Sequence, residues 1–137
     1  MTLNKEEKKT LSKYRLEKAE RLLEDARLLF KESRWESSVN RSYYSALNAA
    51  KAALILFGVD PKTHEGVKTM VNMKLITNGL IGQEYGKWFR NLLSEREDAD
   101  YADYASIDAS DAEEALKNAS RFIKKIKEVI RSVSKQL

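Results

Sequence analysis

Hydrophobic residues recur along this chain every three or four positions, which is the spacing of an amphipathic α-helix. The longest such stripe lies near the C-terminus and runs from Ala112 to Val133. Two earlier stripes run from Leu11 to Phe30 and from Val39 to Phe57. No stretch alternates between apolar and polar residues as a half-buried strand would, so the pattern predicts an all-α fold.

Capping residues set the expected ends of the first two helices. Asn4 followed by Glu7 resembles a capping box and predicts a helix that runs to about Lys31. Ser33 followed by Glu36 gives the same kind of signal for a second helix, which we expect to stop at Gly58.

Three further helices are expected in the second half of the chain. Asp60 and Pro61 predict the start of a short helix that ends at Asn78-Gly79. A fourth helix is expected from about Leu80 to an end between Arg96 and Tyr104, and a fifth begins after a cap at Asp108 or Ser110. The expected architecture is one domain, residues 1–137, formed by an up-and-down bundle of four principal helices and one short helix.

Small residues cover most of the circumference of the second predicted helix. They are Ala46, Ala49, Ala50, Ala52 and Ala53. Other helices can approach such a surface closely, as they approach a central helix or a dimer seam. Alanine is also the best helix former, which explains the same residues without a partner. We favour a homodimer.

Composition narrows the class of protein. The chain has 137 residues, five Gly, one Pro and no Cys, so long helices are favoured, and neither disulfides nor thiolate metal sites are available. The longest apolar run, residues 52–58, is much shorter than a membrane span of about 20 residues. The charged N-terminal segment lacks the apolar core of a signal peptide, so we expect a cytoplasmic protein with no membrane contact.

Charge is strongly segregated although its sum is only +4. Residues 95–114 contain nine acidic residues and one basic residue, Arg96. Residues 117–137 contain seven basic residues and one acidic residue, Glu128. These basic residues fall largely opposite the apolar stripe of their helix, so we interpret them as a solvated face and not as a site for DNA or RNA.

Metal and cofactor sites are not indicated. The Glu-x-x-His spacing of di-iron bundles does not occur, and the single histidine, His64, has no second histidine or cysteine to complete a transition-metal set. Acidic residues after Arg96 lack the glycine and ligand order of a calcium loop. No phosphate-binding glycine loop is present. We therefore expect no cofactor, and we interpret His64 as a helix-start residue with a structural or partner-contact role.

Two polar motifs interrupt the helical pattern. The first is Arg41-Ser42-Tyr43-Tyr44 within the alanine-rich helix, and the second is Arg96-x-x-x-Asp100-Tyr101. Arg41 and the paired tyrosines stand inside a helix that otherwise has the pattern of a core element, and buried charge is costly unless it is paired, so the second motif is a candidate partner for the first. Arg96 stands among acidic residues, and an arginine held in ion pairs is the alternative to a functional role. Together with Thr63-His64-Glu65-Gly66, these motifs resemble the HEPN superfamily (higher eukaryotes and prokaryotes nucleotide-binding) over nearly the whole chain.

The resemblance implies a small dimeric helical bundle of a kind often encoded beside a minimal nucleotidyltransferase, which is its expected partner. Many members of the superfamily are toxins that cut RNA without metal, using an Arg-x(4–6)-His motif. This chain has the arginine, Arg96, but Tyr101 stands where the histidine is expected. Tyrosine, with a reference pKa of about 10, is a poorer base at neutral pH, so we lean against an enzyme and keep Arg96 and Tyr101 only as catalytic candidates.

A binding site is the alternative use of the same residues. If two protomers pack around the second and fourth predicted helices, one polar cleft would contain Arg41, Tyr44, Arg96 and Tyr101. In such a cleft, tyrosine rings can stack on a base and arginines can pair with phosphate. The candidate residues for binding nucleotide or RNA are Arg41, Tyr44, Arg96, Asp100 and Tyr101. In toxins of the superfamily, a tyrosine just after the histidine can be nucleotidylylated by the partner. Tyr104 lies one residue out of register with that position, and we keep it as a candidate for this modification.

The sequence is consistent with three hypotheses of function. The first is a nucleotide- or RNA-associated component of a two-gene toxin–antitoxin-type system with a nucleotidyltransferase partner. The second is a non-catalytic helical binding or interaction module, in which the polar motifs serve the dimer and partner interface. The third is an active metal-independent RNase toxin, which the missing histidine disfavours.

Overall fold

The structure is a computed structural model that describes residues 2–101 and 106–137, with side chains described for residues 2–97 and 106–137. Its elements are α1 (Lys5–Lys31), α2 (Trp35–Ile55), α3 (His64–Met70), the π-helix η1 (Val71–Ile76), α4 (Gln83–Tyr101) and α5 (Ala109–Gln136). The described chain contains no strand, so the all-α prediction is confirmed.

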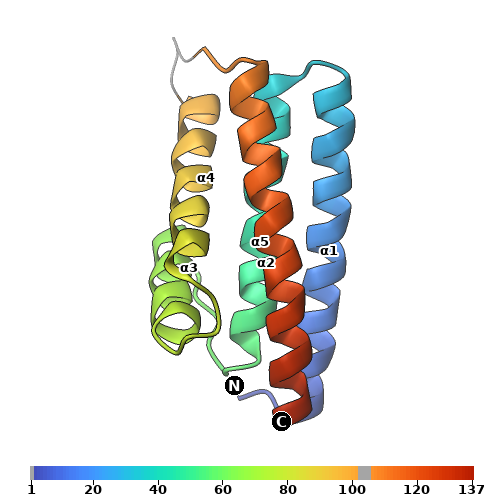
Figure 1. The fold of residues 1–137 in the computed structure, drawn as a ribbon. Helices are drawn as coiled ribbons and strands as arrows, with labels where there is room; N and C mark the ends of the chain where they lie inside the picture. Colours follow the sequence, from blue (N-terminus) through green and yellow to red (C-terminus); the bar gives the residue numbers. More distant parts are fainter. Residues whose placement is uncertain (1, 102–105) are drawn as a thin grey trace.

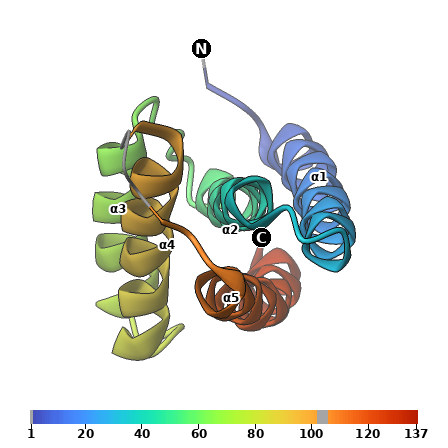
Figure 2. The same cartoon turned by 90° about the horizontal axis from the view of Figure 1, so that it is seen from above.

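The long helices run up and down beside one another, with α2 in the middle (Figure 1). Seen from above, α1 and α5 lie on two sides of α2, and α4 with α3 lies on a third side (Figure 2). The start of α1 and the end of α5 are therefore at the same end of the bundle (Figure 1). This is the predicted bundle of four principal helices, and the short helix is extended by η1.

The alanines of α2 are buried inside the single chain. Each of the five has 0% of its surface exposed. A second copy of the chain cannot reach them in this arrangement, so they mark a central helix and give no support to a dimer seam at these residues. The homodimer remains a prediction, but the alanines of α2 no longer support it.

Small polar side chains tie α1 to α2. The Ser12 hydroxyl donates to the Ala52 carbonyl oxygen at 2.6 Å, and the Ser38 hydroxyl donates to the Ala26 carbonyl oxygen at 2.8 Å. Both serines are buried. Each satisfies its hydroxyl on the backbone of the facing helix, which lets the two helices pack closely without an unpaired polar group.

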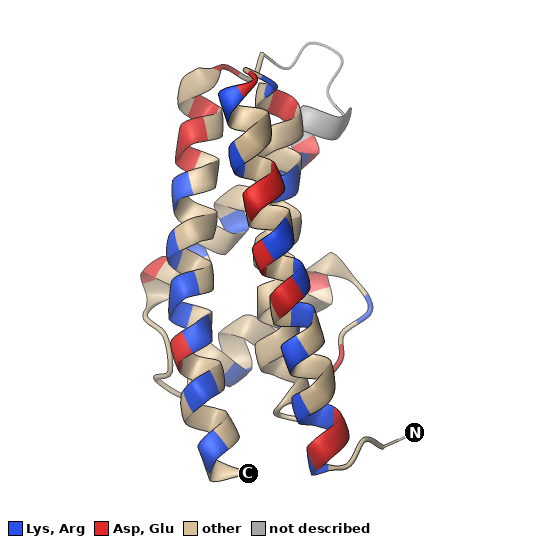
Figure 3. Cartoon of the chain, turned by 90° about the vertical axis from the view of Figure 1, so that its right-hand side faces the viewer, with Lys and Arg blue, Asp and Glu red and all other residues tan. Residues whose placement is uncertain are grey.

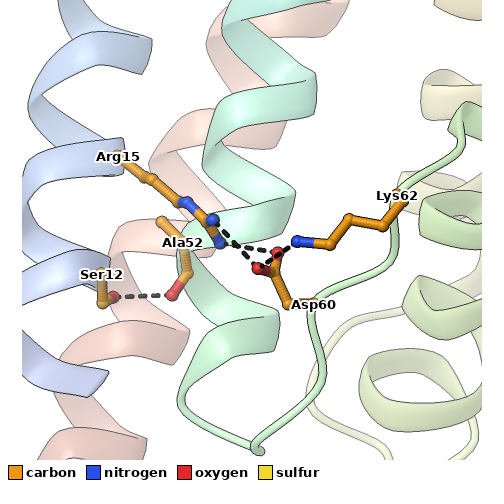
Figure 4. A network of polar contacts seen from close by, with 5 residues as sticks. All are labelled: Ser12, Arg15, Ala52, Asp60 and Lys62. Carbon is orange, nitrogen blue, oxygen red and sulfur yellow. Dashed lines mark hydrogen bonds and ion pairs between the residues drawn. The ribbon is translucent and has the colours of Figure 1, made fainter. Parts of the chain in front are cut away.

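The predicted cap at Asp60 is wrong, and an ion pair explains why. The Asp60 carboxylate lies 3.1 Å from Nη1 of Arg15 and 3.1 Å from Nζ of Lys62 (Figure 4). Although burial opposes it, the hydrogen bonds from Arg15 and Lys62 hold the pKa of this carboxyl below its usual value. Thr63 caps α3 instead, accepting from the Gly66 amide, so α3 begins at His64.

Of the other predicted caps, two form as the sequence signal indicates and one does not. Asn4 with Glu7 and Asp108 with Asp111 form reciprocal capping boxes, which confirms the predicted starts of α1 and α5. Ser33 does not cap α2, because its backbone has φ 59° in the turn that closes α1. A cap residue needs an extended backbone, and this left-handed one cannot supply it.

The π-helix η1 was not predicted, but its end was. Gly79 adopts φ 74°, a conformation that glycine reaches without steric cost, and it closes the segment at the expected Asn78-Gly79. Gly86 of α4 then lies against this segment, since a Cβ at Gly86 would come within 2.5 Å of Cδ1 of Ile76. The missing side chain allows α4 to approach η1.

No described helix is long and apolar enough to cross a membrane.

Enlarging one buried alanine of α2 tests its central position. We expect Ala49→Leu to lower the free energy of unfolding by about 1–3 kcal/mol, because the added carbons enter a filled core. Ser37→Leu is the matched control, since Ser37 is exposed on the same helix and should change stability by less than about 0.5 kcal/mol. Urea unfolding of both variants measures the difference. Equal stability of the two variants would contradict a buried α2.

Candidate functional site

Two adjacent tyrosines interrupt the small residues of α2. Successive residues of a helix point about 100° apart, so the two rings leave the helix in different directions. Tyr43 is wholly buried and Tyr44 is half-buried. Their rings meet edge to face with centroids 5.2 Å apart. The pair therefore extends from the core to the surface.

Arg96 of α4 lies over both rings. Its guanidinium carbon is 5.2 Å from the centroid of Tyr43 and 5.7 Å from that of Tyr44. Only 5% of the residue is exposed. Cations over aromatic faces are stabilised by the ring quadrupole, and more strongly when water is excluded. The two motifs therefore meet through Arg96 and the two tyrosines.

His64 of α3 completes the cluster. Nη2 of Arg96 lies 2.8 Å from Nδ1 of His64. The imidazole also lies beside the two tyrosines, with centroids 5.4 Å from Tyr43 and 6.0 Å from Tyr44. We call Tyr43, Tyr44, His64 and Arg96 the Arg96 cluster. It joins α2, α3 and α4.

An aromatic column anchors the Arg96 cluster in the core. The Tyr43 ring stacks on Phe89 of α4 at 6.0 Å, and Phe89 stacks on Phe122 of α5 at 5.3 Å. Phe89 and Phe122 are almost wholly buried. Core aromatics packed in this way leave the rings of the cluster little freedom to move.

Burial and the guanidinium set the protonation of the cluster. Burial, which Arg96 partly opposes, raises the pKa of the Tyr43 phenol far above its usual 10. Burial, with the positive charge of Arg96 added, lowers the pKa of His64 below 6.5, although Glu97 opposes this. At neutral pH the tyrosine and the histidine are therefore uncharged and the arginine carries the charge.

The predicted site residues fall into three groups. Tyr44 and Arg96 are brought together in the cluster. Arg41 is exposed on α2, and its Nη1 donates to the Asn40 side chain at 2.7 Å. Asp100 and Tyr101 belong to α4, but their side chains lie outside the described residues, as does the whole of Tyr104.

Sequence reasoning missed the role of His64 in this site. The prediction that it begins a helix is confirmed, since it is the first residue of α3. Its contact with Arg96 spans 32 positions of the chain, and no local spacing reveals such a contact. The available signal was that the chain has one histidine, next to a capping threonine.

Three basic residues of α5 contact other side chains within the chain. Nζ of Lys127 lies 3.0 Å from Glu20 of α1, and Nζ of Lys125 lies 3.6 Å from Glu128. The Arg121 guanidinium lies 4.2 Å from the Trp88 centroid. Figure 3 shows acidic residues among the basic ones along α1 and α5. This mixed charge agrees with a solvated face.

Comparison with known proteins identifies relatives that span most of the chain. The sequence profile of the HEPN domain matches residues 12–129. A UPF0332 protein of Thermotoga maritima is 27% identical over 129 residues, which cover 94% of this chain and 98% of that protein. A UPF0332 protein of Archaeoglobus fulgidus is 33% identical over 116 residues, which cover 85% of this chain and 92% of that protein.

A third relative carries a functional name. A protein of Methanocaldococcus jannaschii named "Putative toxin MJ0605" is 29% identical over 118 residues, which cover 86% of this chain and 87% of that protein. Both motifs of the sequence analysis lie within the region that the HEPN profile matches.

Removing the Tyr43 hydroxyl tests the burial of that ring. We expect Tyr43→Phe to change the free energy of unfolding at pH 7 by less than about 1 kcal/mol, because the phenol oxygen is buried without a hydrogen bond of ordinary geometry among the described residues. Above pH 10 the unfolded chain loses this phenol proton before the folded chain does, so the wild type should lose stability as the pH rises. In urea unfolding from pH 7 to 10.5, the free energy of unfolding of Tyr43→Phe should fall less than that of the wild type. Tyr14→Phe, at an exposed tyrosine, should follow the wild-type curve.

The single histidine allows a direct measurement of the lowered pKa. An NMR titration of the His64 ring should give a midpoint below 6.5, and Arg96→Met should move it upward because one of its causes is removed. The unfolded chain binds this proton first as the pH falls below 6.5, so wild-type stability should decrease towards the folded-state pKa. His64→Gln should remove the part of this decrease in stability that comes from protonation of His64. A midpoint at or above 6.5 in the wild type would contradict the arrangement.

Proposed function

The chain belongs to the HEPN domain family, and from this premise we propose that it is the nucleotide- or RNA-associated component of a two-gene toxin–antitoxin-type system. Its partner in this proposal is a minimal nucleotidyltransferase. The name of the toxin relative from Methanocaldococcus jannaschii supports the class of system, since that protein matches this chain over most of both lengths.

The Arg96 cluster is the observation that carries the proposal. It combines a guanidinium, two tyrosine rings and an imidazole from three helices. Arginine pairs with phosphate oxygens, and tyrosine rings stack on bases. Arg96 itself is buried, whereas Tyr44 and His64 keep part of their surface exposed. A nucleotide would therefore meet the cluster at these two residues.

A non-catalytic interaction module is the second candidate, and the burial of Arg96 favours it. Arg96 has 5% of its surface exposed, and its guanidinium is held by two rings and an imidazole, so it already has a structural use, which is to join α4 to α2 and α3. In that case the cluster would stabilise the bundle and bind no nucleotide. The RNase reading requires a proton acceptor, and Tyr101 in place of the motif histidine argues against it.

Binding to a defined RNA separates these functions. We expect the purified protein to bind a fluorescein-labelled single-stranded RNA of ten uridines, as measured by fluorescence anisotropy in chelator. Tyr44→Ala should weaken binding by about 5- to 150-fold, because stacking on one base contributes about 1–3 kcal/mol. Tyr14→Ala is the control, since this exposed tyrosine lies on α1 outside the cluster, and it should bind like the wild type.

Three additional results bear on the same proposal. Expression in a bacterial host should slow growth, and co-expression of a neighbouring nucleotidyltransferase gene should restore it. Absence of binding to RNA and to AMP, together with normal growth, would reject the proposal in favour of the interaction module. Cleavage of the labelled RNA in chelator that is lost in Arg96→Lys would establish the RNase reading.

A further inference from the structure

We infer that His64 is the residue through which this chain contacts a ribonucleotide phosphate, with its Nε2–H as the donor, and that Arg96 is the positioning residue that fixes the imidazole in this state. This inference rests on the proposed function and adds the contacting atom to it. The sequence predicts only a structural or partner-contact role for His64, and the names of the relatives assign it no contact with a nucleotide.

The hydrogen bond between the two side chains determines the tautomer. A guanidinium has five N–H donors and no acceptor, so Arg96 must donate to His64. Nδ1 of His64, at 2.8 Å, is therefore an acceptor without a proton. A neutral imidazole carries its one proton on the other nitrogen, so the proton is on Nε2. Arg96 thereby selects one of the two neutral tautomers.

The ring is held in place from several sides. Tyr43 and Tyr44 lie beside it, and the Thr63 cap fixes the backbone where α3 begins. Among the described residues, Arg96 makes the one hydrogen bond of the imidazole. Nε2 is separated from Nδ1 by one ring carbon, so its N–H points in a different direction from the Arg96 contact, and part of His64 is exposed. Its N–H is thus available as a preorganised donor to a ligand.

The charges that act on the imidazole favour an anion. Arg96 of α4 and Lys51 of α2 are both positive, and Glu97 of α4 is the opposing carboxylate. Lys51 is half-buried, so its charge is incompletely screened by water. A phosphate at Nε2 would gain one hydrogen bond and the attraction of two cations. The neighbouring Tyr44 ring could stack on the attached base.

The same geometry distinguishes a donor from a general base. To accept a proton at Nε2, the ring would have to move its proton to Nδ1, where an Arg96 N–H already points. To accept one at Nδ1, it would have to displace Arg96. Burial and the Arg96 charge both lower the pKa of His64 and oppose the doubly protonated form. Binding through a neutral N–H requires neither change.

Two amide variants separate the two ring nitrogens. In His64→Gln, the longer side chain places an amide N–H2 near the Nε2 position. In His64→Asn, the amide oxygen remains near the Nδ1 position to accept from Arg96, but no donor reaches the ligand. We expect His64→Gln to bind the labelled ten-uridine RNA within about threefold of the wild type and His64→Asn to bind it at least about tenfold more weakly, the loss expected for a hydrogen bond to a charged group. Circular dichroism and urea unfolding verify that both variants are folded.

Nitrogen-15 NMR of the single histidine provides a readout that does not depend on binding strength. In the free wild type it should show protonated Nε2 and unprotonated Nδ1, and in Arg96→Met it should show a mixture of tautomers. Addition of AMP or of the RNA should shift the Nε2 resonance more than that of Nδ1. A shift with AMP assigns the site to a free nucleotide, and a shift with the RNA alone assigns it to a polynucleotide phosphate.

The outcomes distinguish the inference from the proposed function. If Tyr44→Ala weakens RNA binding but His64→Asn does not, the function stands and the role of His64 is overturned. If both His64 variants lose binding equally while folded, the donor assignment is overturned. If the wild type binds neither probe, the proposed function fails and this inference fails with it. Loss in His64→Asn, retention in His64→Gln and the Nε2 shift together support both.

Discussion

The close packing around α2 is the constraint on which the rest of this structure depends. All five other helical elements contact α2. A helix surrounded in this way needs small side chains where neighbouring backbones come near, and its alanines, with no exposed surface, meet that need. Where the small residues are interrupted by Tyr43 and Tyr44, the neighbouring helix must leave room for two rings. The site lies at this interruption.

Burying Arg96 at this position requires compensation, because a guanidinium removed from water loses its hydration. The structure supplies two ring faces and one imidazole nitrogen. Each of these groups comes from α2 or α3, so the contacts that Arg96 of α4 requires set how α2, α3 and α4 pack together. The exposed ion pairs of the bundle, such as Lys125 with Glu128, do not constrain the fold in this way.

Local signals in the sequence predicted the helices well because helix starts are determined by residues three positions apart. Asn4 with Glu7 and Asp108 with Asp111 illustrate this. The failures have non-local causes. Asp60 could not cap α3 since Arg15, 45 positions earlier, and Lys62 hold its carboxylate. Ser33 could not cap α2 since the turn after α1 required a left-handed backbone.

The candidate site was predictable in part for the same reason. Paired tyrosines and an arginine inside apolar helices require partners, and Tyr44 and Arg96 do lie together in the structure, although their use in binding stays a prediction. It could not identify His64, because the nearest cluster residue in sequence, Tyr44, is twenty positions away and nothing in the spacing relates them. Arg41 shares the tyrosine motif but is exposed beside Asn40. Membership of one sequence motif therefore does not imply membership of one site.

A structural role and a ligand-binding role for the Arg96 cluster are compatible, and the first favours the second. The contacts that compensate the buried guanidinium also fix the tautomer of His64 and the orientation of Tyr44 before any ligand arrives. A preorganised donor loses less entropy on binding than a mobile surface side chain does. Substituting Arg96 consequently disturbs both roles at once, whereas changes at His64 and Tyr44, the two partly exposed members, separate them. Variants of the partly exposed residues His64 and Tyr44 are therefore the ones that report on ligand binding by the cluster.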